Sequence, residues 1–203
     1  MFICGVIQLV YRVTRTFDNE DLMYLTHLYS TLPSKFYKKD LTLFNTERRD
    51  VPNLDDGGWS KIISKQIVDS KKYIPKRQYF LKYTYNSFCI IHQDNPSAVK
   101  ETSITLIDKS SDLEGGEIYI RSPVYENDLR EGIVRNHPQE KGNVLRIGED
   151  IVPETIAQNV GETVWYPIGT YHGVTKVKKG YRIVLVTWFG EYNEKDQIYK
   201  ETV

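Results

Sequence analysis

Two histidines and one carboxylate in the second half of the chain could bind a metal ion together. His92 and Asp94 are separated by one residue, and alternate residues of a β-strand point to the same face. His172 comes from a segment far along the chain. Two histidines and a carboxylate on one side of a metal ion, with its other positions open, suit non-haem Fe(II) sites. The spacing therefore predicts a metal site formed by these three side chains.

Arg182 adds a cation to the same region. It belongs to residues 181–189, which are apolar on both faces apart from Arg182 and Thr187, so we expect this strand to be buried. A buried guanidinium without an anion is unfavourable, and its planar fork fits a carboxylate. Arg182 is therefore a candidate for binding the carboxylate of a co-substrate. The alternative is a structural ion pair with an acid such as Glu162.

Each of these residues also has a simpler interpretation. A His-x-Asp pair alone is a weak signal, and a histidine before Gly-Val is commonly a hydrogen-bonded residue at the end of a strand. We expect residues 172–177 and 181–189 to form a hairpin. A loop at residues 178–180, with its glycine in the left-handed conformation, would place Arg182 and His172 on one face.

The motifs around these residues resemble those of the Fe(II)/2-oxoglutarate-dependent dioxygenase superfamily, and within it the prolyl 4-hydroxylase type. The likeness covers residues 79–189. It is carried by Tyr83-x-x-Asn86-x-x-Cys89-x-x-His92-x-Asp94, Gly115-Gly116-Glu117, Gly161, Tyr166-Pro167, His172-Gly173-Val174 and Gly180-Tyr181-Arg182. It implies a mainly β fold of the α+β type, with a double-stranded β-helix core (jelly-roll or cupin-like) and N-terminal supporting helices.

The resemblance also implies roles for single residues. The metal ligands for Fe(II) would be His92, Asp94 and His172, and the residues contacting 2-oxoglutarate would be Arg182, Tyr83 and Trp188. The chain departs from the prolyl hydroxylase pattern, which often has Gly in place of Asn86, Tyr in place of Cys89 and Lys in place of Arg182. These departures concern the substrate rather than the iron site.

The activity implied by the resemblance is hydroxylation of an unactivated C–H bond with O2, with release of succinate and CO2. The expected substrate is a peptidyl prolyl or other amino-acid side chain, followed by a free amino acid or small metabolite. Nucleic-acid bases are a third substrate class. A cupin-like metal-binding module without redox chemistry and a zinc-dependent hydrolase are the alternative functions, because two histidines and an aspartate also bind zinc.

The charge balance argues against nucleic acid or an anionic membrane as a partner. Lys plus Arg equals Asp plus Glu, at 27 each. The basic cluster at residues 71–77 keeps nucleic acid as an alternative. Two cysteines do not form a disulfide framework, so we expect a reducing, cytoplasmic setting. No apolar run reaches the length needed to span a bilayer.

The 203 residues suit one oxygenase domain, residues 1–203. We expect residues 1–78 to form a supporting region and residues 79–189 the catalytic β-helix core. Residues 121–158 are irregular and charged, which predicts an insert that covers the substrate. Residues 190–203 form a charged tail.

Local signals predict the first elements of the chain. A strand is expected at residues 2–13. The first helix should begin at Asp18 and end before Pro33, and the second should begin at Ser60 and end near Lys71.

The second half of the chain reads mainly as strands. Strands are expected at residues 79–85, 102–107, 118–120 and 161–167. The paired glycines Gly115-Gly116 indicate a bulge or a close approach of the backbone to another group.

Overall fold

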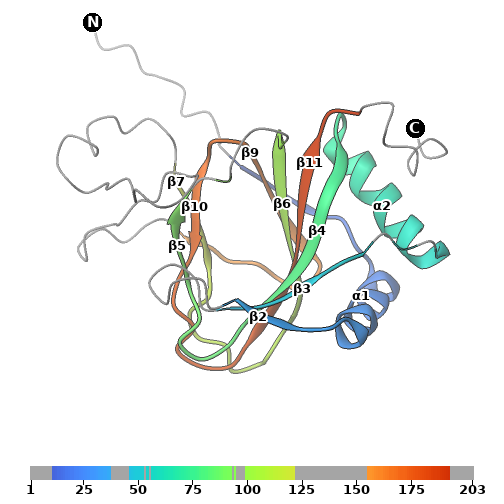
Figure 1. Cartoon of the computed structure of the whole chain (residues 1–203). Helices are drawn as coiled ribbons and strands as arrows, with labels where there is room; N and C mark the ends of the chain where they lie inside the picture. The colour runs from blue at the N-terminus through green and yellow to red at the C-terminus, as the bar shows by residue number, and fades with distance from the viewer. Residues whose placement is uncertain are drawn as a thin grey trace, which may run out of the picture.

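The computed structural model describes residues 11–37, 46–52, 54, 56–92, 94, 99–121 and 155–192. Within these ranges the chain forms two β-sheets and two α-helices (Figure 1). Most of the strand expected at residues 2–13, most of the insert expected at residues 121–158 and the tail from residue 193 lie outside the described residues.

The larger sheet has seven strands, and every neighbouring pair is antiparallel. In spatial order the strands are β1 (Arg12–Arg15), β9 (Glu162–Pro167), β6 (Glu101–Lys109), β11 (Arg182–Gly190), β4 (Ile74–Tyr83), β3 (Thr46–Asp50) and β2 (Lys35–Tyr37). Strands β6, β9 and β4 confirm the expected ones, although β4 begins earlier than predicted and ends before Tyr85.

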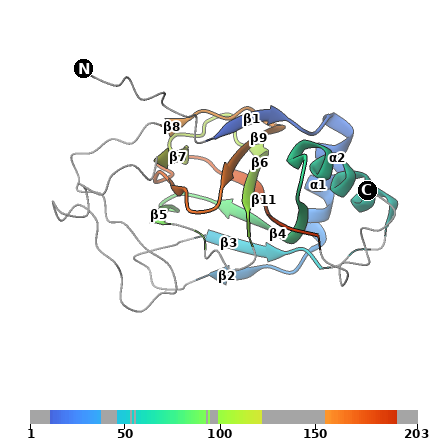
Figure 2. The ribbon, with the colours of Figure 1, turned by 90° about the horizontal axis from the view of Figure 1, so that it is seen from above.

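The smaller sheet has four antiparallel strands, which in spatial order are β5 (Cys89–His92), β10 (Tyr171–Val174), β7 (Ile118–Arg121) and β8 (Thr155–Ile156). Seen from above, the two sheets surround a common interior, and both helices lie outside the larger sheet (Figure 2). This is the mainly β, double-stranded β-helix architecture with supporting helices that the family resemblance implies.

Helix α1 (Asn19–Thr31) begins and ends where the sequence predicts. The Asp18 side chain accepts a hydrogen bond from Asp21 N, and the Asp21 side chain accepts one from Asp18 N, both at 3.0 Å. This reciprocal capping box satisfies two donors that the first turn leaves without helical partners. The helix ends with Leu32 as its C-cap, before Pro33.

Helix α2 (Gly57–Ser70) begins a turn earlier than predicted. Its N-cap is Asp56, whose carboxylate accepts a hydrogen bond from Trp59 N at 2.7 Å, so the prediction of Ser60 as the cap is wrong. The acceptor at Asp56 outweighs the low helix propensity of the two glycines that follow it. No helix among the described residues is long and apolar enough to cross a membrane.

Strand β11 separates two apolar layers. Ile183 and Leu185 belong to the core between the larger sheet and the helices, whereas Val184 and Val186 belong to the core between the two sheets. Alternate residues point to opposite faces, so a strand at the centre of a covered sheet is apolar on both. The expectation that this strand is buried is confirmed.

The predicted hairpin of residues 172–177 with 181–189 is wrong. Strand β10 pairs with β5 and β7, whereas β11 pairs with β4 and β6 in the other sheet. After β10 the chain bonds to a neighbouring loop, where Val177 N donates to Ser87 O at 2.9 Å. This hydrogen bond fixes the segment between β10 and β11, which leads from the smaller sheet to the larger one. Gly180 has φ of 72°, so the left-handed glycine is confirmed in a different connection.

Candidate metal and co-substrate site

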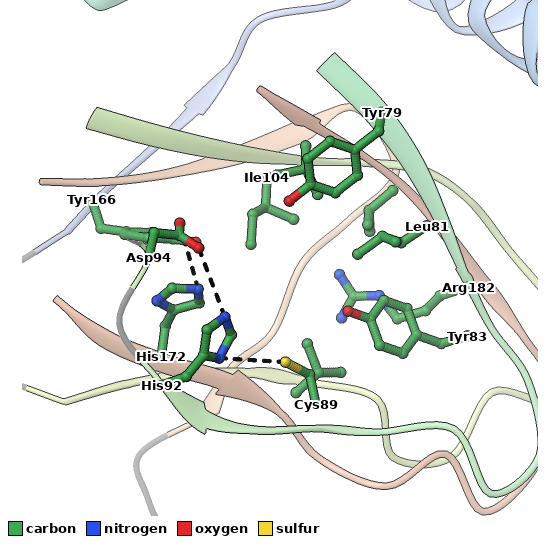
Figure 3. A pocket seen from close by; sticks show the side chains of 13 residues that line it. Tyr79, Leu81, Tyr83, Cys89, His92, Asp94, Ile104, Tyr166, His172 and Arg182 are labelled. Atoms are coloured by element: carbon green, nitrogen blue, oxygen red, sulfur yellow. Dashed lines mark hydrogen bonds and ion pairs between the residues drawn. The ribbon is translucent and has the colours of Figure 1, made fainter. Parts of the chain in front are cut away.

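The three predicted metal ligands lie together at one side of the interior (Figure 3). His92 and His172 are directly opposite each other in the β5–β10 pair, and their ring centroids are 4.3 Å apart. Asp94 follows β5 and places Oδ1 3.8 Å from His92 Nε2 and Oδ2 3.9 Å from His172 Nε2. One ligand atom from each residue lies within 4.8 Å of the others, so a single ion can contact all three.

Neighbouring groups orient these side chains toward one point. His172 Nδ1 lies 3.0 Å from Thr170 O, a carbonyl that only accepts, so Nδ1 carries the proton and Nε2 keeps its lone pair. Thr102 Oγ1 donates to Asp94 Oδ2 at 3.0 Å. Such hydrogen bonds are typical of metal ligands, because they fix the tautomer and the angle of the ligand. The donor set therefore fits a divalent metal ion.

A cavity extends from these ligands into the space between the sheets. Its lining residues are Tyr79, Leu81, Tyr83, Cys89, His92, Asp94, Ile104, Tyr166, His172, Val174, Arg182, Val184 and Val186. The metal ligands occupy one side, and Arg182 and Tyr83 lie together on the other (Figure 3). Most of the wall between them is apolar, so polar groups are concentrated at the two ends.

Arg182 is a buried cation with incomplete hydrogen bonding. Its side chain donates to Gly116 O and, at 2.8 Å, to Gln158 Oε1. Its Nε is buried and has no hydrogen-bond partner among the residues that the structure describes. Burial lowers the pKa of Arg182 to about 10, and the negative charge of Glu117 acts in the opposite direction. The guanidinium is therefore charged at neutral pH and has a donor available for an anion.

The alternative of an ion pair between Arg182 and Glu162 is not what the structure shows. Glu162 instead accepts hydrogen bonds from the backbone and side-chain amides of Asn159, at 2.7 and 3.1 Å. Within the described part of the chain, no carboxylate forms a salt bridge with Arg182.

Three buried tyrosines, Tyr79, Tyr83 and Tyr166, line the cavity. Burial is the main cause that raises the pKa of each hydroxyl well above its usual value, so all three remain protonated donors. The negative charge of Asp94 raises the pKa of Tyr79 and Tyr166 further. The ring of Tyr166 also packs against His172, with centroids 4.6 Å apart. The cavity thus offers neutral hydrogen-bond donors beside the Arg182 guanidinium.

Comparison with solved structures identifies the fold. No protein-family model and no curated protein matches the sequence. A 2OG-Fe(II) oxygenase family oxidoreductase from Burkholderia pseudomallei superposes with a TM-score of 0.60 at 15% identity, over 92% of this chain and 88% of that one. A prolyl-4-hydroxylase from Pseudomonas putida gives 0.61 at 10% identity, over 91% and 94%. The chain has the fold of the 2OG-Fe(II) oxygenases.

A third structure with this oxygenase fold contains both a metal and the co-substrate. HygX from Streptomyces hygroscopicus, with nickel and 2-oxoglutarate bound, superposes with a TM-score of 0.63 at 11% identity, over 90% of this chain and 83% of that one. At these identities the likeness concerns the fold, and the site must be argued from the side chains present here.

Within the oxygenase fold, five of the six predicted site residues line one cavity: His92, Asp94, His172, Tyr83 and Arg182. Trp188 does not line it. It shares a face of β11 with Arg182, but six strand residues span about 20 Å, which carries it past the cavity. Trp188 packs edge-on against Tyr79 instead, with ring centroids 6.0 Å apart.

Gln158 is the residue that the sequence analysis missed most completely. Its Oε1 accepts from Arg182, and its Nε2 donates to the backbone oxygens of Ile104 and Glu162, at 3.0 and 3.1 Å. Gln158 is therefore fixed on both sides while it holds the guanidinium. It lies at the end of the segment predicted as an irregular insert, where no periodic signal marks it.

The orientation of Thr102 was predictable from the sequence, but its contact with Asp94 was not. It occupies the same face of β6 as Ile104, which lines the cavity, so the strand alternation that was recognised already directs it inward. Without a view of Asp94 opposite, nothing distinguished this threonine from an ordinary strand residue.

The paired glycines predicted as a close approach have that role in the oxygenase fold. Both have positive φ, 75° for Gly115 and 76° for Gly116. A Cβ on Gly116 would lie 2.9 Å from Val177 Cγ2 and 3.2 Å from Arg182 Cδ. A side chain at this position would crowd Arg182, and the Gly116 carbonyl is one of the acceptors of the Arg182 guanidinium.

Proposed function

We propose that this protein is an Fe(II)- and 2-oxoglutarate-dependent dioxygenase that hydroxylates an unactivated C–H bond. One observation carries the proposal. A single cavity has two histidines and an aspartate on one side and a buried arginine, without a carboxylate partner among the described residues, on the other. A cupin-like binding module or a zinc hydrolase would need the two histidines and the aspartate, but neither function explains a buried arginine in the same cavity.

His92, Asp94 and His172 would hold Fe(II), which when bound supplies O2 activation coupled to decarboxylation of 2-oxoglutarate to succinate and CO2. The chain's own residues keep the ligands in place. Thr102 holds Asp94, and the Thr170 carbonyl fixes the tautomer of His172. Three protein ligands leave positions open for the co-substrate and O2.

Arg182 would bind the distal carboxylate of 2-oxoglutarate, with the Tyr83 hydroxyl as a second donor. The Arg182 Cζ lies 6.0 Å from the centroid of the Tyr83 ring, so one carboxylate can be reached from both side chains. The apolar wall between the arginine and the metal ligands, which includes Leu81, Val184 and Val186, excludes water and strengthens this charge pairing.

The proposed substrate is an amino-acid side chain, with a peptidyl proline as the first candidate. The prolyl-4-hydroxylase of Pseudomonas putida, with 94% of its length covered, supports this choice. A small molecule is the second candidate class, because a further structure of HygX contains hygromycin B together with 2-oxoglutarate.

Succinate release tests the proposal. Protein incubated in air with Fe(II), ascorbate and 2-oxoglutarate should release succinate, and Asp94→Ala should abolish this turnover while leaving the fold intact. Replacing Fe(II) with Zn(II) should have the same effect as the substitution. Unchanged turnover in Asp94→Ala would show that the carboxylate is not a ligand.

A further inference from the structure

The cavity wall continues past Tyr79 into a group of charged and aromatic side chains, which we call the mouth cluster: Arg48, Asp50, Arg77, Tyr79 and Trp188. Cross-strand partners share a face of a sheet. Asp50 is opposite Tyr79 and Arg48 is opposite Leu81 in the β3–β4 pair, and Trp188 is opposite Arg77 in the β4–β11 pair. Tyr79 and Leu81 line the cavity, so the cluster lies on the same face of the larger sheet as the cavity wall, next to the cavity.

Aromatic rings hold the two guanidinium groups of the cluster. Arg48 Cζ lies 3.8 Å from the centroid of the Tyr79 ring. Arg77 Cζ lies 5.9 Å from the same centroid and 5.6 Å from that of Trp188. Tyr79 and Trp188 meet edge to face at 84°. Cation–π contacts of this kind orient an arginine without using its N–H donors.

The cluster has one carboxylate for two guanidinium groups. Arg48 is largely buried and donates through Nε to Asp50 Oδ1 at 2.8 Å. Arg77 NH2 lies 3.8 Å from the same oxygen, beyond hydrogen-bond distance, and half of the Arg77 side chain is exposed. Asp50 is therefore the closer partner of Arg48. Among the described residues of the cluster one positive charge is left over, and it lies at Arg77, beside the rings that lead to the cavity.

We infer that Arg77 binds a carboxylate of the substrate, so that the hydroxylated molecule is an acidic peptide. This inference rests on the proposed function and names its substrate class. The rings of Tyr79 and Trp188 supply an apolar surface for the carbon chain between the carboxylate and the reacting C–H bond. A nucleic acid is disfavoured, because the Asp50 carboxylate would repel a second phosphate next to the one that Arg77 binds.

The test uses full-length protein, loaded without oxygen with Fe(II) and 2-oxoglutarate, and a library of N-acetylated, C-amidated pentapeptides. Each peptide contains one proline with Glu, Gln or Lys near it, and retention of each peptide is measured. Wild type should retain Glu peptides up to about fivefold more than matched Gln peptides, as one partly exposed charge pair provides. Arg77→Gln should remove this difference, and Arg77→Glu should retain Lys peptides over Glu peptides. Lys72→Gln removes an exposed positive charge away from the cluster and should behave as wild type.

The inference would be overturned if wild type retained Glu and Gln peptides equally, or if it retained neither kind of peptide. A preference for Glu peptides that persists in Arg77→Gln would overturn it as well. A merely structural role of Arg77 would not move the preference to Lys peptides in Arg77→Glu. The rise in melting temperature caused by 2-oxoglutarate is measured in the same samples. Its absence contradicts the proposed function itself, whereas its presence without a Glu preference contradicts only the role of Arg77.

Discussion

His172 and Arg182 line the same cavity from two different sheets. His172 lies on β10 in the smaller sheet, and Arg182 begins β11 in the larger one. The segment between them crosses from one sheet to the other, so its two ends face each other across the interior. This crossing places the candidate metal ligand and the buried cation of the candidate co-substrate site on opposite walls of the cavity.

Replacing Arg182 with Met should distinguish the effect of the buried charge on stability from its role in binding 2-oxoglutarate. Without 2-oxoglutarate, the free energy of unfolding should stay the same or rise by up to about 4 kcal/mol, because a buried charge is replaced by an apolar chain. The rise in melting temperature caused by 2-oxoglutarate should disappear. Urea unfolding and thermal melts measure the two effects. Strong destabilisation of Arg182→Met without ligand would instead identify a structural arginine.

Gln158 should affect 2-oxoglutarate binding through Arg182. Gln158→Ala removes the acceptor that positions the guanidinium, and we expect the Kd for 2-oxoglutarate to rise about tenfold, as loss of one charge-assisted hydrogen bond predicts. Gln158→Glu should weaken binding more, because its carboxylate pairs with Arg182 and competes with the ligand. Calorimetric titration measures both. Asn159→Ala, next in the chain and exposed, is the control, and an equal loss there would contradict a specific role for Gln158.

Gly116→Ala should cost more than the matched change at Gly169. Both glycines have positive φ, 76° and 81°, which costs a non-glycine residue about 1–3 kcal/mol. A Cβ at Gly169 meets nothing within 4 Å, whereas at Gly116 it meets Val177 and Arg182. The clash should add about 1–3 kcal/mol to the loss of unfolding free energy in Gly116→Ala. Equal losses in urea unfolding would show that the loop moves aside freely.

The acid dependence of stability should depend on Asp18. A hydrogen bond from Lys65, followed by one from Asp21 N, lowers the pKa of Asp18 well below its ordinary value of 3.8. The folded state thus holds the proton more weakly than the unfolded state, so the stabilisation is complete above about pH 5 and is lost as pH falls. Asp18→Asn keeps the helix cap but not the charge. Its stability should fall below that of wild type at pH 7 and converge with it in acid, whereas a constant gap from pH 7 to pH 2 would contradict the pKa shift.

Local sequence patterns predicted the parts of the fold that depend on neighbours in the chain. The capping box at Asp18 and the apolar alternation of β11 are such features, and both are confirmed. The hairpin before Arg182 was wrong because a glycine turn fixes a local bend and does not specify which sheet receives the next strand. The same limit explains the late start predicted for α2, where either Asp56 or Ser60 could serve as the cap.

The candidate site was predictable where residue types are chemically unusual, and not where they are ordinary. A His-x-Asp pair, a distal histidine and a buried arginine stand out in any sequence, and all four side chains line the cavity. Gln158 became visible only when the fold placed its amide against the guanidinium. Trp188 lies on the same face of β11 as Arg182 but farther along the strand than the cavity reaches. Strand alternation predicts the face of a residue and does not predict where along the strand a cavity ends.

An anaerobic titration tests the central claim most directly. Protein without metal is given Fe(II) and then 2-oxoglutarate, and the visible charge-transfer band of a 2-oxoacid chelated to iron is followed, with Arg182→Ala as the control. The band should appear in wild type and weaken in the variant at the same 2-oxoglutarate concentration. Absence of the band in wild type, together with tight binding of zinc, would contradict the dioxygenase and favour a hydrolase or a binding module.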